Sequence, residues 1–238
     1  MIIVDSPITG KRENLTQAQF NSYMAQTNGA VLKWIVNPVL KHQEHDQKTH
    51  GAWATGDYPT KDSHPELNGS LKEYVSEYPK EIGYAAVNSH LRLGNNNFTD
   101  KAMSQVKRVI SDLDKAVELS PRTTEPITAY KGVHETLITQ LEKLGVGGTF
   151  EDKGFTSVSP KKEVALGFPS FRSGNLIQIE MPSGVKAINP YKYFGRSSVS
   201  GTKLADEKEL ILGRGSSFEI TGIEKTEYGT TIKARLVP

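Results

Sequence analysis

The sequence predicts an α+β fold, because the spacing of its apolar residues changes from helical to alternating along the chain. Helical spacing dominates from about residue 68 to residue 120, and alternation dominates from residue 127 onwards. Of the 238 residues, 36% are hydrophobic, which is enough to build a core. Residues 1–67 are polar, rich in turn signals and weakly periodic. We therefore predict an N-terminal extension of unknown role over residues 1–67 and one folded domain over residues 68–238.

The clearest predicted helix follows Asp100, which we expect to act as its N-cap, and ends at Ser120-Pro121. One apolar stripe runs along this helix at helical spacing: Met103, Val106, Ile110, Leu113 and Val117. Ser70 and Glu73 have the spacing of a capping box at the start of an earlier helix. The other helices are predicted at residues 16–25, 70–78, 80–91, 135–144 and 159–168.

Six strands are predicted, at residues 127–131, 155–159, 176–181, 207–212, 217–223 and 231–237. The glycine-rich stretch 145–148 lies after a helix and before a strand. A dinucleotide-binding fingerprint needs the opposite order, with the loop leading into a helix N-terminus. We therefore interpret this stretch as a flexible turn.

Charge and composition exclude several classes of protein. The chain has 29 basic and 27 acidic residues, and this balance argues against a dedicated nucleic-acid-binding protein. It has no cysteine, which excludes a disulfide framework and thiolate chemistry and suits a reducing cytoplasm. No secretory signal is apparent at its start, and no apolar run approaches the ~18 residues of a membrane span. We expect a soluble protein without a membrane partner.

Three short stretches on predicted strands carry the candidate chemistry: Tyr130-Lys131-Gly132, residues 154–159 and residues 206–212. In a strand, Glu207 and Glu209 would share a face, as would Ser157 and Ser159. Two carboxylates on one face should raise the pKa of at least one of them unless a cation or ligand lies nearby. Taken singly, each stretch also fits a structural role. Glu-Xaa-Glu is common on solvated strand faces, and Ser-Val-Ser is common at strand ends and helix caps.

The order of these stretches resembles the R-S-E class of mono-ADP-ribosyltransferases, which includes binary-toxin exoenzymes and enzymes carried by bacteriophages. Its motifs are an aromatic-Arg-Gly strand, an aromatic residue leading into Ser-Thr-Ser, and Glu-Xaa-Glu before an apolar strand. Here the second and third motifs read Phe155-Thr156-Ser157-Val158-Ser159 and Glu207-Lys208-Glu209-Leu210-Ile211-Leu212. The resemblance covers roughly residues 68–238. It implies the ADP-ribosyltransferase fold, in which helices are followed by two packed, mainly antiparallel β-sheets that form an NAD+ cleft.

The first motif departs from the family pattern, because Lys131 stands where the family has arginine. Arginine presents a planar fork of donors to phosphate or ribose oxygens, whereas lysine is a flexible point charge. The charge is kept but the geometry is not, so a looser NAD+ site is expected. This departure also leaves a catalytically inactive descendant open as an alternative.

The resemblance implies a role for each candidate residue. Glu209 would stabilise the positive charge that develops on ribose when the nicotinamide bond breaks, and Ser157 would orient it. Glu207 would engage an arginine acceptor, because the double-Glu motif is the family's mark for that acceptor. Lys131 would neutralise NAD+ phosphate, beside Tyr130 in the first motif. The Gly132 backbone would approach the nicotinamide amide.

Two aromatic segments have both a functional and a structural interpretation. Phe168 or Phe171 would pack on the nicotinamide ring, or would simply belong to the core. Residues 191–196 lie where the family keeps a mobile loop before its last motif. This segment would contact the acceptor protein, or its aromatic residues would anchor it to the domain.

Residues 41–53 contain three of the six histidines, His42, His45 and His50, together with Asp46. Imidazole and carboxylate groups are suitable metal ligands, but the spacing matches no standard metal-binding helix. We therefore interpret the segment as a solvated polar stretch and assign no metal. It also resembles segments of bacteriophage head proteins, which suits an enzyme packaged in a virion and injected with the DNA.

The resulting prediction is an enzyme that uses NAD+ as cosubstrate and transfers ADP-ribose to arginine side chains of a host protein, in the cytoplasm of the host cell. Two alternatives stay open. One is an NAD+ glycohydrolase, in which water replaces the protein acceptor. The other is an inactive structural or binding protein of a phage virion.

Overall fold

The computed structural model describes residues 56–76, 82–94, 97–167, 174–195, 199, 204–227 and 229–237, and the backbone of residues 2–5 and 12–15. The chain divides into two compact units, residues 1–52 and 53–238. In the first unit, β1 (Ile2–Asp5) and β2 (Arg12–Leu15) pair as antiparallel strands. The helix predicted at residues 16–25 and the histidine-rich segment lie outside the described residues. The assignment of residues 1–67 to a separate extension stays a prediction.

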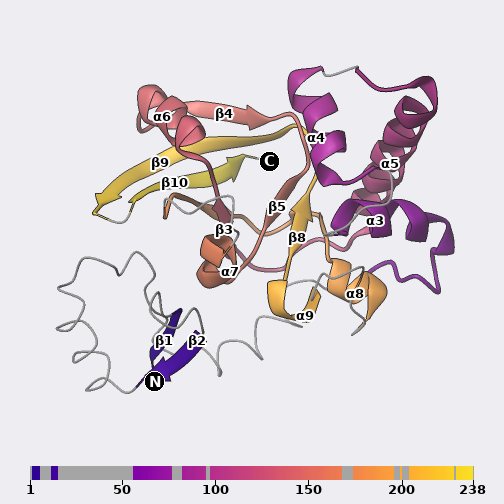
Figure 1. Ribbon diagram of the computed structural model, residues 1–238, viewed down its shortest axis with the longest axis horizontal. Helices are drawn as coiled ribbons and strands as arrows, with labels where there is room; N and C mark the ends of the chain where they lie inside the picture. The colour runs from indigo at the N-terminus through magenta and orange to yellow at the C-terminus, as the bar shows by residue number, and fades with distance from the viewer. Residues whose placement is uncertain are drawn as a thin grey trace. The chain divides into compact units, whose positions relative to one another are not determined.

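The second unit begins with helices (Figure 1). These are the 3-10 helix η1 (Pro65–Leu67), α3 (Asn68–Val75), α4 (Tyr84–Leu93) and α5 (Asp100–Leu119). The helix predicted after Asp100 is confirmed, but its N-cap is Thr99, whose hydroxyl accepts the Ala102 N–H. Asp100 therefore occupies the first turn, where its negative charge complements the helix dipole.

The capping box predicted at Ser70 and Glu73 is wrong, because α3 already begins at Asn68. Ser70 lies inside the helix, and its hydroxyl donates to the carboxylate of Asp112 on α5. The hydroxyl that matched a cap pattern therefore ties two helices together. The helix predicted at residues 80–91 begins later, at Tyr84, and ends where Gly94 adopts the left-handed conformation of a C-cap, with a φ of 64°.

A five-stranded sheet has the order β3-β6-β10-β9-β4. Its strands are β3 (Ile127–Gly132), β4 (Thr149–Asp152), β6 (Leu176–Met181), β9 (Ser216–Thr226) and β10 (Gly229–Val237). Of its four strand pairs, only β6 with β10 is parallel. Helix α6 (Glu135–Leu144) lies against this sheet (Figure 1) and has the bounds predicted from the sequence.

A second sheet of three antiparallel strands has the order β5-β8-β7. It consists of β5 (Thr156–Val158), β7 (Ala187–Ile188) and β8 (Leu210–Leu212). Short helices border it: α7 (Lys162–Gly167), α8 (Pro190–Phe194) and α9 (Leu204–Glu207). Helices followed by two mainly antiparallel sheets confirm the predicted α+β fold.

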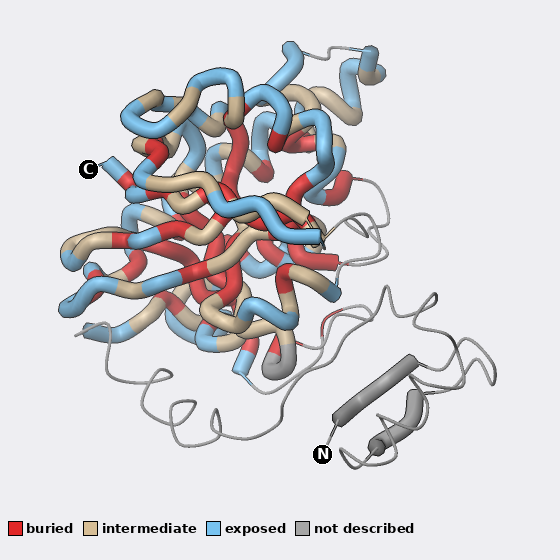
Figure 2. Tube along the Cα trace, turned by 90° about the vertical axis from the view of Figure 1, so that its left-hand side faces the viewer, coloured by how far each residue is buried: buried red, intermediate tan, exposed pale blue. Residues whose placement is uncertain are grey.

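The three-stranded sheet separates two apolar clusters, because side chains that alternate along β8 point to opposite faces of the sheet. Leu210 and Leu212 belong to the cluster between the two sheets, which also includes residues of α6. Ile211 belongs to the other cluster, which contains residues of α3, α4 and α5. Figure 2 shows the buried residues running through the middle of the described chain. Both faces of β8 are therefore buried, which explains its wholly apolar sequence.

The segment before α3 also packs on the helical cluster, to which Leu67 belongs. The Tyr193 hydroxyl donates to the His64 carbonyl oxygen at 2.7 Å, and the Lys61 N–H donates to the Tyr193 carbonyl oxygen at 3.1 Å. Lys61 and His64 therefore contact α8. Within the described residues, no helix is long and apolar enough to cross a membrane.

Candidate active site

Three of the predicted site residues meet where the two sheets adjoin. Lys131 lies near the end of β3, Ser157 is the middle residue of β5, and Glu209 immediately precedes β8. The Ser157 side chain hydrogen-bonds to the Glu209 carboxylate. The Lys131 ammonium lies 3.4 Å from the Ser157 carbonyl oxygen and interacts electrostatically with Glu209. A cation, a hydroxyl and a carboxylate thus come from three segments of the chain.

The environment of Glu209 perturbs its ionisation. Burial raises its pKa above the usual carboxyl value, because an anion loses hydration there. The Ser157 hydrogen bond and the Lys131 charge act in the opposite direction and stabilise the anion. A desolvated carboxylate beside a cation is the kind of group that stabilises a positive charge forming next to it.

Glu207 and Glu209 do not share a strand face, so this expectation was wrong. Glu207 ends α9, and β8 begins only at Leu210. Between the two glutamates, Lys208 has a φ of 49°, and it is the one non-glycine residue of the described chain with a positive φ. Such a conformation costs about 1 kcal/mol and is often found at functional sites. The turn separates the two carboxylates into a helix end and a strand entry.

Ser159, directly after β5, connects this turn to β5. Its hydroxyl donates to the Glu207 carbonyl oxygen at 2.8 Å and accepts the Lys161 N–H at 3.1 Å. Its backbone exchanges hydrogen bonds with Tyr130, at 2.7 and 2.9 Å. Ser159 therefore links β3, the start of α7 and the Glu207 turn.

Lys131 is surrounded by charged groups from three other segments. Burial lowers its pKa, the carboxylates of Asp152 and Glu209 raise it, and the Arg92 cation lowers it, with a net value of about 8. About half of the Lys131 side chains are therefore neutral at pH 8, and the neutral fraction rises above this pH. At neutral pH most Lys131 side chains are protonated, whereas an arginine would be fully protonated at any working pH.

Sequence reasoning assigned no role to Arg92 and Asp152, which form an ion pair beside this site. Arg92 Nε lies 2.7 Å from Asp152 Oδ1, and Arg92 Nη2 lies 2.8 Å from Asp152 Oδ2. Arg92 Nη2 also donates to the Phe155 carbonyl oxygen at 3.2 Å. The available signal was Asn88 four residues before Arg92, since this spacing places two polar residues on one face of α4.

A buried chain of hydrogen bonds supports Ser157 from behind. Asn88 Nδ2 donates to the Tyr74 hydroxyl at 3.0 Å, and the Tyr74 hydroxyl is hydrogen-bonded to the Ser157 side chain. The amide nitrogen Asn88 Nδ2 can only donate, and the ionised Glu209 carboxylate can only accept. The order of donation therefore runs from Asn88 through Tyr74 and Ser157 to Glu209. Burial, and then the Glu209 charge, raise the pKa of Tyr74, so its hydroxyl stays protonated.

The other predicted residues differ in what the structure shows. Gly132 is buried and pairs with Leu176, whereas Tyr130 is partly exposed. Burial and the Glu163 charge raise the pKa of Tyr130. Phe168 and Phe171 lie outside the described residues, so their contact with nicotinamide stays a prediction.

The aromatic segment predicted at residues 191–196 forms much of α8. Tyr193 and Phe194 are buried in the helical cluster and pack edge to face, with ring centroids 4.8 Å apart. Their burial supports the interpretation that this segment anchors itself to the domain.

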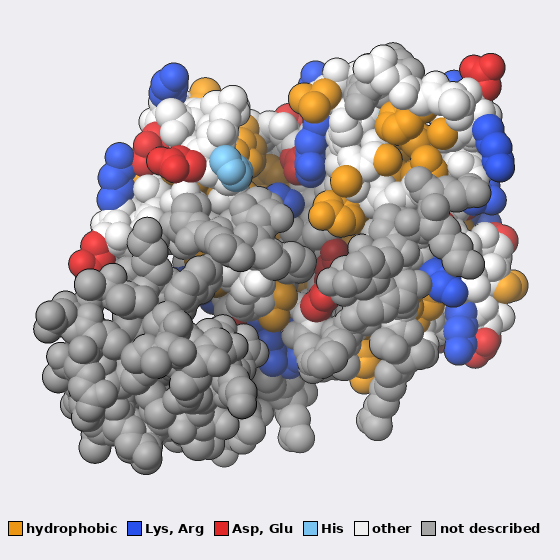
Figure 3. Space-filling model, in the orientation of Figure 1, with side chains coloured by type: hydrophobic (Ala, Val, Ile, Leu, Met, Phe, Trp, Pro, Cys, Tyr) orange, Lys and Arg blue, Asp and Glu red, His pale blue; other side chains and the backbone are white. Residues whose placement is uncertain are grey.

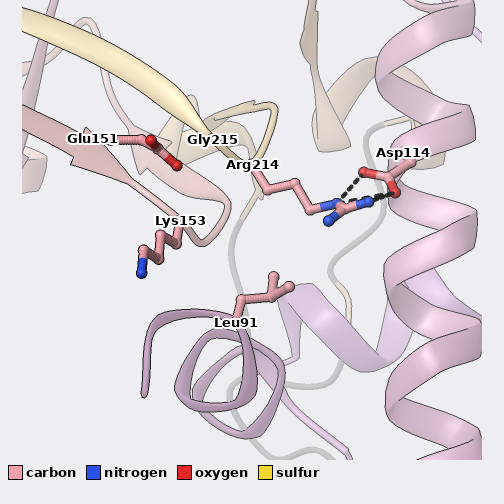
Figure 4. A pocket seen from close by; sticks show the side chains of 6 residues that line it. All are labelled: Leu91, Asp114, Glu151, Lys153, Arg214 and Gly215. Atoms are coloured by element: carbon pink, nitrogen blue, oxygen red, sulfur yellow. Dashed lines mark hydrogen bonds and ion pairs between the residues drawn. The ribbon is translucent and has the colours of Figure 1, made fainter. Parts of the chain in front are cut away.

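An open pocket of about 460 Å³ lies near this site without including it. Figure 4 shows its lining: Leu91, Asp114, Glu151, Lys153, Arg214 and Gly215. Arg214 extends towards Asp114 of α5 and pairs with it, with Nη2 and Oδ2 3.0 Å apart. Glu151 and Lys153 flank Asp152 in sequence, and side chains alternate along a strand. We therefore assign the pocket to the other side of β4 and do not identify it with the active site.

Charged side chains of both signs are interspersed over the face in view in Figure 3. Ion pairs on and beside the five-stranded sheet include Arg235 with Glu219 at 2.8 Å, and Lys225 of β9 with Glu142 of α6 at 3.0 Å. This face therefore carries no single basic patch among the residues described.

Comparison with known families gives one match. The model of the family described as "ADP-ribosyltransferase exoenzyme" matches residues 52–237, which include every described residue of the site. No curated protein matches the sequence.

Solved structures with a similar fold include the ADP-ribosyltransferase Vis in complex with agmatine. It is 21% identical, with a TM-score of 0.58 over 85% of this chain and 88% of that chain. The toxin Plx2a from Paenibacillus larvae is 16% identical, with a TM-score of 0.51 over 77% and 100% of the two chains. HopU1 of Pseudomonas syringae pv. tomato DC3000 is 21% identical, with a TM-score of 0.50 over 74% and 82%.

Proposed function

The chain belongs to the ADP-ribosyltransferase exoenzyme family, whose cosubstrate is NAD+, and on this premise we propose that it transfers ADP-ribose to arginine side chains of a protein. One observation carries the proposal. Glu209 is held beside Ser157 and Lys131, and Glu207 stands two residues before it at the partly exposed end of α9. One carboxylate would thus act on the sugar and the other on the acceptor.

Glu209 would act on the bond between nicotinamide and ribose. As this bond breaks, nicotinamide leaves with the electron pair and positive charge develops on the ribose ring, as in glycoside hydrolysis. The Glu209 carboxylate stabilises this charge, and its partly desolvated position strengthens the interaction. Ser157 donates to the carboxylate and keeps it oriented.

Lys131 and Arg92 would bind the pyrophosphate of NAD+. The pyrophosphate has two negative charges, and these two residues interact electrostatically with each other next to Ser157. Arg92 would supply the delocalised charge of a guanidinium whose Nε and Nη2 are held by Asp152, whereas Lys131 would supply a point charge. The small Gly132 beside Lys131 leaves its backbone accessible to a polar group of the substrate.

Glu207 would select arginine as the acceptor. A guanidinium is protonated at any working pH, so a nearby carboxylate must orient it and take the proton released when its nitrogen bonds to ribose. Agmatine, the molecule in the similar Vis structure, carries a guanidinium group. This supports a guanidinium acceptor for a protein with the same fold.

Two matched substitutions test the assignment of the two carboxylates. With Glu207→Gln, transfer to agmatine should fall at least about a hundredfold, in the range of a lost general base, while NAD+ hydrolysis survives. With Glu209→Gln, both reactions should be lost. Equal transfer by Glu207→Gln and the wild type would exclude the role of Glu207. Hydrolysis without any transfer by the wild type would favour an NAD+ glycohydrolase.

We further propose that the acceptor is a host protein and that the enzyme acts in the host cytoplasm after delivery in a phage virion. The support is the resemblance of residues 41–53 to phage head proteins, together with the absence of cysteine. Labelled NAD+ added to host-cell lysate would identify the acceptor by mass spectrometry. An acceptor found only among secreted or extracellular proteins would contradict this proposal.

A further inference from the structure

The carboxylate of Asp152, at the end of β4, is the most heavily hydrogen-bonded group described near the site. It accepts from Arg92 Nε at 2.7 Å and from Arg92 Nη2 at 2.8 Å. It also accepts from the Thr156 hydroxyl at 2.6 Å and from the Gly154 N–H at 3.0 Å. Its side chain is 15% exposed. Burial raises its pKa, but the Arg92 and Thr156 hydrogen bonds and the Arg92 and Lys131 charges more than offset this, so the pKa is lowered.

Asp152 acts on both cations of the site, through hydrogen bonds to Arg92 and through its charge on Lys131. Arg92 reaches it from α4, and Lys131 on β3 lies within the field of both Asp152 and Arg92. Two cations that face each other in a partly desolvated site repel. The negative charge of Asp152 compensates this repulsion, and its four hydrogen bonds keep the carboxylate in one orientation.

The lysine at position 131 makes this compensation necessary. An arginine is protonated at any working pH and would remain a cation whatever its neighbours. A lysine in a partly buried position loses its proton more readily, and the Arg92 cation increases that tendency. Two carboxylates, those of Asp152 and Glu209, raise the Lys131 pKa and so oppose the loss of its proton. Glu209 engages the sugar in the proposed reaction, which leaves Asp152 as the permanent counter-charge.

We propose that Asp152 is a positioning residue of the transferase reaction, which fixes the Arg92 guanidinium and provides the counter-charge that makes Lys131 an effective substitute for arginine in NAD+ binding. This inference rests on the proposed function. Asp152 itself touches neither the reacting bond nor the acceptor. It acts on NAD+ affinity through Arg92 and Lys131.

The test measures NAD+ affinity by calorimetry from about pH 6 to about pH 9.5, a range that spans the lysine pKa. In the wild type, affinity should weaken as the pH rises through about 8, because the Lys131 cation is lost. Asp152→Asn keeps the shape of the side chain but removes the charge that raises the Lys131 pKa. The pH at which affinity weakens should therefore move down by about one unit, so affinity should be roughly fivefold lower near pH 8 and roughly tenfold lower above about pH 9.

Two variants separate this role from a merely structural one. Lys131→Arg combined with Asp152→Asn should remove the pH dependence and recover most of the lost affinity. Glu151→Gln, which removes the same charge from the neighbouring exposed position on β4, should behave like the wild type. If the affinity of Asp152→Asn has the wild-type pH dependence, or if Lys131→Arg does not rescue it, the inference is wrong.

A second readout does not require NAD+. The side-chain NMR signal of Lys131, assigned by its loss in Lys131→Arg, reports the lysine pKa in the free protein. It should titrate at lower pH in Asp152→Asn and at higher pH in Arg92→Gln, which removes the opposing cation. A signal that moves in neither variant overturns the inference, even if Asp152→Asn folds poorly. If the wild type binds no NAD+, the proposed function fails, and the lysine titration still decides whether Asp152 is the counter-charge.

Discussion

Tyr130 and Ser159 exchange two backbone hydrogen bonds, at 2.7 and 2.9 Å, and this pair joins the two sheets at the candidate active site. Lys131 directly follows Tyr130, and Ser157 lies two residues before Ser159. The pair of bonds therefore brings Lys131 beside the strand that carries Ser157. The Ser159 hydroxyl extends the link to the Glu207 carbonyl oxygen. The position of the Glu207 turn relative to Lys131 therefore depends on Ser159.

Replacing this serine tests the link. In Ser159→Ala, the Glu207 carbonyl oxygen and the Lys161 N–H lose their hydrogen bonds to the Ser159 hydroxyl, at a cost of about 1 to 2 kcal/mol in the free energy of unfolding. The Glu207 turn should loosen, so transfer to agmatine should fall more than NAD+ hydrolysis. Urea denaturation and the two assays measure this. An equal fall in both activities would show that Ser159 does not act through Glu207.

The pH dependence of the reaction should be bell-shaped. Only the ionised form of Glu209 stabilises the ribose cation, and burial raises its pKa, so kcat/KM should fall on the acid side above the usual carboxyl range. On the alkaline side it should fall as the pH rises through about 8, where Lys131 loses its proton. Lys131→Arg should remove the alkaline fall and leave the acid side in place. An alkaline fall that persists in Lys131→Arg would assign it to another group.

Gly154 is predicted to tolerate no side chain. A Cβ atom there would lie 2.6 Å from Asn88 Oδ1 and 2.9 Å from Arg92 Nε, both of which are held by other hydrogen bonds. Gly154→Ala should cost about 1 to 3 kcal/mol of stability and raise the KM for NAD+ through Arg92. Gly69→Ala is the matched control, because a Cβ there meets nothing within 4 Å and alanine favours the helix. Equal stability of the two variants would refute this account of Gly154.

The Tyr74 hydroxyl is predicted to act through Ser157. Tyr74→Phe keeps the ring against Phe155 but leaves the buried Asn88 amide without its acceptor. Stability should fall by about 1 to 3 kcal/mol, the cost of an unsatisfied buried donor. The kcat should fall about fivefold or more, while the KM for NAD+ changes little. A rise in KM alone would place Tyr74 in substrate binding instead.

Much of this architecture could be predicted from local patterns. The bounds of α6 and β6 follow from apolar periodicity and from the turn residues beside them, because both elements bury one regular face. Lys131, Ser157 and Glu209 could be singled out because their motifs lie on or next to strands whose apolar residues fix the register.

The rest depends on contacts that leave no local signal. The turn at Lys208 follows a helix of four residues, too short for any period to be visible, so the glutamates were placed on a strand. The ion pair between Arg92 and Asp152 joins residues 60 positions apart. Such a pair is set by how α4 packs on the end of β4, and only the folded chain shows it.

The central claim is that this protein transfers ADP-ribose to arginine with Glu209 as its catalytic carboxylate. The most direct measurement incubates labelled NAD+ with an arginine-rich polypeptide and either the wild type or Glu209→Ala, with nicotinamide release followed in parallel. The account predicts label on the polypeptide with the lability of an arginine linkage towards neutral hydroxylamine, and loss of both signals with Glu209→Ala. Neither label nor nicotinamide release from the wild type, or equal labelling by the two proteins, would contradict it.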